Sequence, residues 1–102
     1  MITSKQRAYL RALANGLETI LIVGKGGVSA DVIKQADEAL TAREIFKGKV
    51  LESAKERARE VATILAEATM SEIVQVIGTK FILYRKNEKK PKINLPKGWL
   101  CD

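Results

Sequence analysis

The sequence lacks histidine, holds a single cysteine and has few aromatic residues and no long apolar run. Without histidine, the usual general base, zinc ligand and catalytic triad are missing. Cys101 can form no internal disulfide, which fits a reducing cytoplasm. The apolar runs have only the length of strands, which argues against a membrane-spanning or secreted segment. We therefore expect a cytoplasmic protein that is not an enzyme and needs no metal or cofactor.

The charge of the chain is positive and unevenly placed. Its 102 residues include 18 lysines and arginines against 12 aspartates and glutamates, a net charge of +6. The excess falls in residues 1–34 and 86–102, whereas residues 35–85 carry equal numbers of each sign. A surface that serves only solubility usually intersperses the two signs. The uneven placement therefore favours a polyanion as partner.

The hydrophobic spacing predicts one domain over residues 1–86 and a basic tail over residues 87–102. A capping box at Thr3 and Gln6 opens the first expected helix, which Asn15 and Gly16 end with a left-handed cap. The further elements are expected as a strand at 18–23, a helix at 29–42, a strand at 44–51, a helix at 53–69, and strands at 73–77 and 80–85. This α-β-α-β-α-β-β order predicts an α/β chain of the two-layer α+β type, with a mixed four-stranded sheet packed against helices.

The expected strands differ in character. Residues 18–23 are almost wholly apolar, which predicts burial on both faces of the sheet. Residues 44–51 contain Gly48, a residue that weakens a strand. The last two strands are separated by Gly78 and Thr79, which is a strong hairpin signal. The sheet is therefore expected to end in an antiparallel pair.

Gly24-Lys25-Gly26-Gly27 lies between the first expected strand and the second expected helix. Glycine allows positive φ and close approach of a ligand, and the first N–H groups of a helix have no partner within it. The segment fits GxxG, with which KH domains hold a nucleic-acid backbone, but neither GxxxxGK[ST] nor GxGxxG. We predict a phosphate cradle here, with positive φ at Gly26. The alternative is a tight connection in which glycine only permits the turn.

Arg7 and Arg11 lie four residues apart on one flank of the first expected helix. Such a pair alone would be an ordinary solvated flank. Because Lys25 and Lys34 fall in the same third of the chain, we interpret the four as one basic surface that contacts phosphates. In the tail, Trp99 is expected to pack against the domain or to have no specific role, and stacking on a base is the alternative.

Further motifs occur in order over nearly the whole domain. They are Ile-Thr-Ser-Lys-Gln-Arg-Ala-Tyr-Leu-Arg at 2–11, Val-Gly-Lys-Gly-Gly-Val at 23–28, Val-Ile-Lys-Gln at 32–35, Glu-Ala-Leu-Thr-Ala-Arg-Glu at 38–44, Val-Gln-Val-Ile-Gly at 74–78 and Leu-Tyr-Arg at 83–85. With these motifs the chain resembles the YhbY family of small bacterial RNA-binding proteins, stand-alone forms of the CRM (chloroplast RNA splicing and ribosome maturation) domain. It departs from the family at Gly48, where the family strand is usually apolar.

The resemblance implies a fold like the C-terminal domain of bacterial translation initiation factor three. It also implies association with precursors of the large ribosomal subunit, whose ribosomal RNA would contact the GxxG loop and nearby basic residues. At matching positions these are Gly24, Lys25, Gly26 and Gly27 in the loop, and Lys5, Arg7, Arg11, Lys34, Arg43 and Arg85 around it. A monomer is the favoured oligomeric state.

Two other functions fit parts of the sequence. A protein–protein module would dock its basic face on an acidic ribosome assembly factor and keep that partner after nuclease treatment. A small nucleotide-using enzyme would need a defined phosphate pocket and would be stabilised by ATP, GTP or NAD.

Overall fold

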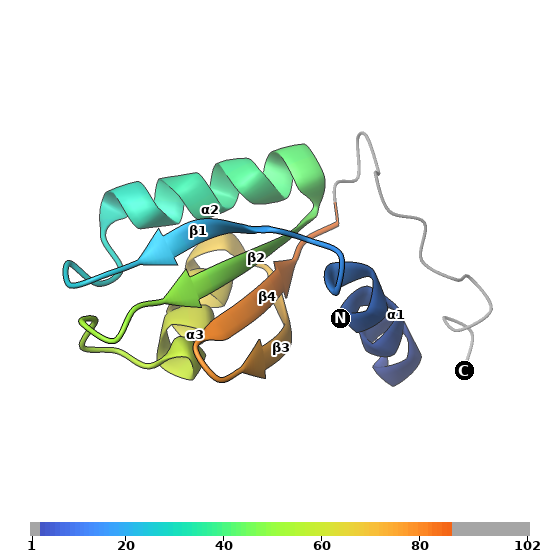
Figure 1. The fold of residues 1–102 in the computed structure, drawn as a ribbon. Coiled ribbons are helices and arrows are strands. Elements are labelled where there is room, and N and C mark those ends of the chain that lie inside the picture. Colours follow the sequence, from blue (N-terminus) through green and yellow to red (C-terminus); the bar gives the residue numbers. More distant parts are fainter. Residues whose placement is uncertain (1–2, 87–102) are drawn as a thin grey trace.

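A computed structural model describes residues 3–86, which form three helices and a four-stranded sheet (Figure 1). The elements are α1 (Ser4–Ala14), β1 (Thr19–Val23), α2 (Ala30–Arg43), β2 (Ile45–Val50), α3 (Ala58–Thr69), β3 (Glu72–Ile77) and β4 (Lys80–Tyr84). The strand order is β1-β2-β4-β3, with β1 parallel to β2 and β4 antiparallel to both its neighbours. The predicted fold class and element order are confirmed. The predicted basic tail, with Trp99 and Cys101, lies outside the described residues.

The helix starts follow from side-chain caps. Thr3 Oγ1 accepts from the Gln6 N–H at 3.1 Å, and Gln6 Oε1 accepts from the Thr3 N–H at 2.9 Å, so the predicted capping box is present. Ser29 caps α2 by accepting from the Val32 N–H at 3.3 Å. No helix within residues 3–86 has the length and apolar character needed to cross a membrane.

The end of α1 differs from the prediction. Asn15 has a right-handed φ of −58°, and Gly16 has no positive φ, so the expected left-handed cap is absent. Instead, the N–H groups of three successive residues donate three positions back, from Asn15 to Ala12, from Gly16 to Leu13 and from Leu17 to Ala14. The last turn therefore tightens rather than reversing.

The two faces of the sheet are covered unequally (Figure 1). Helices α2 and α3 pack on one face, over the buried side chains of Leu21, Val23, Phe46, Val50, Phe81 and Leu83. On the other face α1 places Leu10 and Ala14 over the buried side chains of Ile45, Val74, Ile82 and Tyr84. Because α1 covers only one end of this face, Ile20 and Ile22 of β1 remain 39% and 59% exposed. The prediction that β1 is buried on both faces is therefore wrong.

Tyr84 lies beneath α1 and is 2% exposed. Burial raises the pKa of its phenol above the ordinary value, and the neighbouring charge of Glu44 raises that pKa further. Both effects disfavour the phenolate. The phenol therefore stays protonated in the α1-facing core at neutral pH.

Gly48 lies inside β2 directly opposite Phe81 of β4. A Cβ atom on Gly48 would lie 2.3 Å from Phe81 Cζ, far inside van der Waals contact. The Phe81 ring also meets Phe46 edge-on, with ring centroids 6.1 Å apart. The glycine in the second strand thus makes room for an aromatic ring of the core rather than interrupting the strand.

Candidate nucleic-acid interface

The Gly24–Gly27 segment forms an exposed turn at the end of β1. The Gly27 N–H donates to the Gly24 carbonyl at 2.9 Å, which closes the turn. Gly27 has a φ of +69°, whereas Gly26 has no positive φ and has open space where a Cβ would lie. The prediction of positive φ at Gly26 is therefore wrong, because the left-handed conformation falls one residue later.

The turn leaves part of the predicted cradle available. Within residues 3–86 no acceptor takes the backbone N–H groups of Lys25 and Gly26, and both residues are exposed. The Lys25 ammonium likewise has no carboxylate partner in that part of the chain. By contrast, the Gly27 N–H is used by the turn. This geometry offers two amide donors and one cation to an anion.

The N-terminus of α2 contributes less than the sequence predicted. Ser29 Oγ already accepts a hydrogen bond from the Val32 N–H, and Asp31 places a carboxylate in the first turn of the helix. A carboxylate at this position competes with an external anion for the positive end of the helix dipole. The turn itself is therefore the main candidate for phosphate contact.

A second loop, residues 51–57, lies beside the glycine turn at the same end of the sheet (Figure 1). The Leu51 N–H donates to the Val23 carbonyl at 2.9 Å, which joins the two loops where they begin. A Cβ on Gly27 would lie 2.9 Å from Glu56 Oε1, the end of a flexible side chain that can move aside, so it is the positive φ that requires glycine at this position. This loop also carries Lys55 and Arg57, two exposed cations. The sequence prediction missed them because it placed residues 53–57 in a helix that begins only at Ala58.

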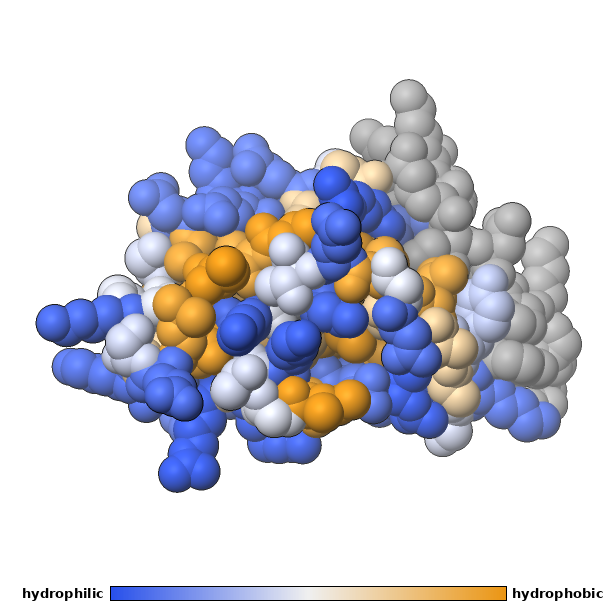
Figure 2. Space-filling view, viewed as in Figure 1, coloured by the Kyte–Doolittle hydropathy of each residue, from blue (hydrophilic) through white to orange (hydrophobic). Residues whose placement is uncertain are grey.

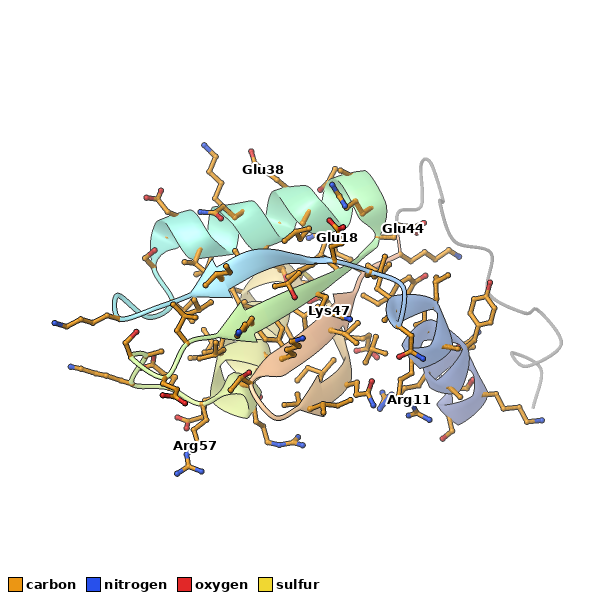
Figure 3. All side chains as sticks on the ribbon, in the orientation of Figure 1. Arg11, Glu18, Glu38, Glu44, Lys47 and Arg57 are labelled. Atoms are coloured by element: carbon orange, nitrogen blue, oxygen red, sulfur yellow. The ribbon has the colours of Figure 1, made fainter. Side chains whose placement is uncertain are left out.

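The predicted basic residues are not gathered around the turn. Lys5, Arg7 and Arg11 belong to α1, which lies at the opposite end of the sheet from the turn (Figures 1 and 3). Arg43 ends α2 at that same far end, whereas Lys34 lies in the N-terminal half of α2 and is exposed. These residues and Lys25 therefore do not form one compact basic patch.

Arg85 is held by intramolecular contacts. Its guanidinium donates to Asp37 Oδ1 at 2.7 Å, to the Thr69 carbonyl at 2.9 Å, to Thr41 Oγ1 at 2.8 Å and to the Asp37 carbonyl at 3.2 Å. These acceptors come from α2 and the end of α3, so the side chain joins both helices to the end of β4. Such a guanidinium is poorly placed to contact RNA as well.

Three further cations lie on the sheet between the glycine turn and α1. Lys47 and Lys49 of β2 and Lys80 of β4 alternate with core residues, which places them on the face that α1 partly covers. Lys47 is labelled on this face in Figure 3. Counting charges along the chain missed these lysines because they fall in the balanced section. The strand alternation was the signal that could have found them.

An α+β domain with an exposed glycine turn, and with cations that have no carboxylate partner among residues 3–86, has the features of a small nucleic-acid-binding protein. The family model for the CRS1/YhbY (CRM) domain matches residues 2–85, and the chain belongs to this family.

Individual relatives match over most of the chain. The Bacillus subtilis protein named "Probable RNA-binding protein YqeI" is 43% identical, over 94% of this chain and all of its own length. A Haemophilus influenzae protein named "RNA-binding protein" is 30% identical over 94% of this chain and 96% of its own length. The solution structure of the hypothetical protein SAV1595 from Staphylococcus aureus, 44% identical, superposes with a TM-score of 0.78 and covers 94% of this chain and all of that one. The expectation of a YhbY-type chain is confirmed.

Proposed function

We propose that this protein binds RNA through the Gly24–Gly27 turn and acts without catalysis on precursors of the large ribosomal subunit. Membership of a family whose named relatives are RNA-binding proteins supports RNA as the partner. The observation that carries the proposed site is the exposed turn, in which two backbone N–H groups and the Lys25 ammonium have no partner within residues 3–86. The ribosomal target rests on the resemblance to the YhbY family.

Binding would proceed in two steps. The net charge of +6 attracts the phosphate backbone and speeds encounter, without regard to sequence. A phosphate then docks against the amides of Lys25 and Gly26, with the Lys25 ammonium adding a charge-assisted contact. The cations of α1 lie too far from the turn to contact that phosphate, so they would engage another part of the RNA.

Substitutions within the turn test this site. In Gly27→Ala, an L residue would have to adopt a φ of +69° and displace the Glu56 carboxylate, so we expect the strained φ to distort the turn and weaken RNA binding. Gly26→Ala is the matched control, because a Cβ there meets open space and no positive φ. Lys25→Ala should reduce the slope of log affinity against log salt by about 0.7, the value for one phosphate contact on a single strand.

Fluorescence anisotropy with a labelled single-stranded RNA measures all three variants, and circular dichroism confirms that each is folded. The site proposal fails if the Gly27→Ala and Lys25→Ala variants bind with the affinity and salt slope of the wild type.

The ribosomal target requires a separate experiment in cells. We expect the tagged protein to sediment with large-subunit precursors in a sucrose gradient and to leave those fractions after nuclease treatment. Retention after nuclease treatment would instead indicate a protein–protein module docked on an acidic assembly factor. If the protein is found only in the top fractions of the gradient, the ribosomal assignment is contradicted. RNA binding itself is tested separately by the anisotropy measurements.

A further inference from the structure

The register of the sheet places four side chains in one row across all four strands. Ile22 of β1 is paired with Lys49 of β2, Lys49 is paired with Lys80 of β4, and Lys80 is paired with Ile77 of β3. Cross-strand partners point to the same face of a sheet, and here it is the face that carries α1. The row lies next to the glycine turn, because β1 and β2 end and β4 begins at this end of the sheet.

No helix within residues 3–86 covers this part of the sheet, and we call Ile22, Lys47, Lys49, Ile77 and Lys80 the open sheet face. Ile22 and Ile77 are 59% and 61% exposed, because α1 packs at the other end of the strands. Figure 2 shows apolar surface and hydrophilic side chains side by side over this region. Both kinds of side chain are therefore accessible together.

The charge on the open sheet face is of one sign. Among the residues of the four strands, the sole carboxylate belongs to Glu72, which is paired with Tyr84 at the end that α1 covers. None of the three lysines has a carboxylate partner within residues 3–86. Lys49 and Lys80 even oppose each other directly, an arrangement that destabilises a sheet. A polyanion would remove this repulsion, whereas a protein partner would need matching carboxylates.

We propose that the open sheet face binds a single-stranded segment of RNA that runs from the glycine turn towards α1. This proposal rests on the proposed function and extends it to a second surface. Phosphates would contact Lys47, Lys49 and Lys80, and the bases would lie against the exposed isoleucines. A single strand fits because its unstacked bases can reach aliphatic side chains, whereas a duplex presents mainly its backbone. The face also bridges the distance between Lys25 and the cations of α1.

Reversing one charge in the row tests the phosphate contacts. Lys80→Glu removes the repulsion with Lys49 and creates a cross-strand ion pair, so we expect the melting temperature to rise by about 1–5 °C. The same substitution should weaken RNA binding by about tenfold, which is the change expected for the loss of one charge-assisted hydrogen bond. The probe is a single-stranded RNA of about 10 nucleotides. Arg59→Glu is the matched control, because Arg59 is exposed on α3, in the helical layer behind the sheet.

A second pair of variants tests the base contacts without changing charge. Ile22→Ser should weaken binding by about fivefold, the change expected if a base removes most of the exposed part of this side chain from water. Ile64→Ser is the control, because Ile64 is 42% exposed on α3. Anisotropy gives the affinities, and size-exclusion chromatography of the same samples gives the oligomeric state.

The outcomes separate this proposal from the proposed function. If Lys25→Ala weakens binding but Lys80→Glu and Ile22→Ser do not, RNA binds at the turn and the open sheet face is not part of its site. Equal losses of RNA affinity in Lys80→Glu and Arg59→Glu would mean that only the net charge matters, and this would overturn the proposal. Wild-type affinity of Ile22→Ser with a changed elution volume would mean that a second copy of the chain occupies the face instead. If the wild-type protein binds no RNA, the proposed function fails as well.

Discussion

Gly48 and Phe81 form a matched pair across β2 and β4, in which the ring fills the space that a Cβ would need. We expect Gly48→Ala to lower the free energy of unfolding by about 1–3 kcal/mol, the usual cost of overpacking a core. Gly16→Ala is the control, since nothing lies within 4 Å of its Cβ position and its φ is not positive. Urea denaturation of both variants measures the difference. Equal stabilities would mean that the Phe81 ring moves aside freely.

The glycines show how far the sequence alone predicts the conformation and contacts of a single residue. A glycine inside an expected strand signals a close approach, but its partner Phe81 is known only once the register of β2 and β4 is known. In the glycine turn the sequence indicated correctly that a positive φ would occur. It placed that φ at Gly26 rather than Gly27, because the closing hydrogen bond from Gly27 to Gly24 cannot be read from composition.

Among the elements, the junction of α2, α3 and β4 depends on Arg85. Its bonds to Asp37, Thr41 and Thr69 suit a planar guanidinium, and an ammonium cannot satisfy all of these acceptors from one position. We expect Arg85→Lys to lower the free energy of unfolding by about 1–2 kcal/mol in urea denaturation. Arg43→Lys, on the exposed end of α2, should change it by less than about 0.5 kcal/mol.

RNA titrations of these two variants decide whether Arg85 also has the contact role that the family resemblance implies. A purely structural role leaves the affinity of folded Arg85→Lys at the wild-type value. A loss of RNA affinity in Arg85→Lys with unchanged stability would contradict a purely structural role.

Periodicity and capping predicted most elements of this fold. The capping box of α1 and the Gly78 hairpin depend on neighbouring residues alone, and both are present. The start of α3 was predicted too early, because Ala54 continues the apolar spacing of the helix. The helix begins instead at Ala58, where Glu60 Oε1 accepts from the Arg57 N–H at 3.4 Å. Burial of β1 on both faces could not be judged, because the position of α1 is a tertiary property.

For the whole molecule, the sequence predicted a polyanion partner but not the arrangement of the cations. Charges counted along the chain placed the basic surface in its first third, whereas the fold carries α1 to the far end of the sheet from the turn. The lysines between them belong to strands whose two faces have different surroundings. Which of their side chains share a surface follows from strand register alone.

The division of the chain into a domain and a basic tail can be tested by shortening the chain. The tail, residues 87–102, contains four lysines, Lys89, Lys90, Lys92 and Lys97. A chain that ends after Lys86 should keep a cooperative thermal transition, because the core clusters lie within residues 3–86. Its RNA affinity should fall less steeply with salt, by about 0.7 in log–log slope for each phosphate that the tail lysines bind in the full chain. Unfolding of the shortened chain would show that the domain boundary is misplaced.

The opposed Lys49 and Lys80 side chains have a consequence for the life of the protein in the cell. If RNA neutralises this pair, part of the binding free energy is relief of a strain that the free protein carries. Ligand-bound chains are then harder to unfold than free ones, and proteolysis acts mainly on unfolded chains. Copies in excess of their RNA would be removed first, so the amount of protein would follow the supply of its target without any separate regulator.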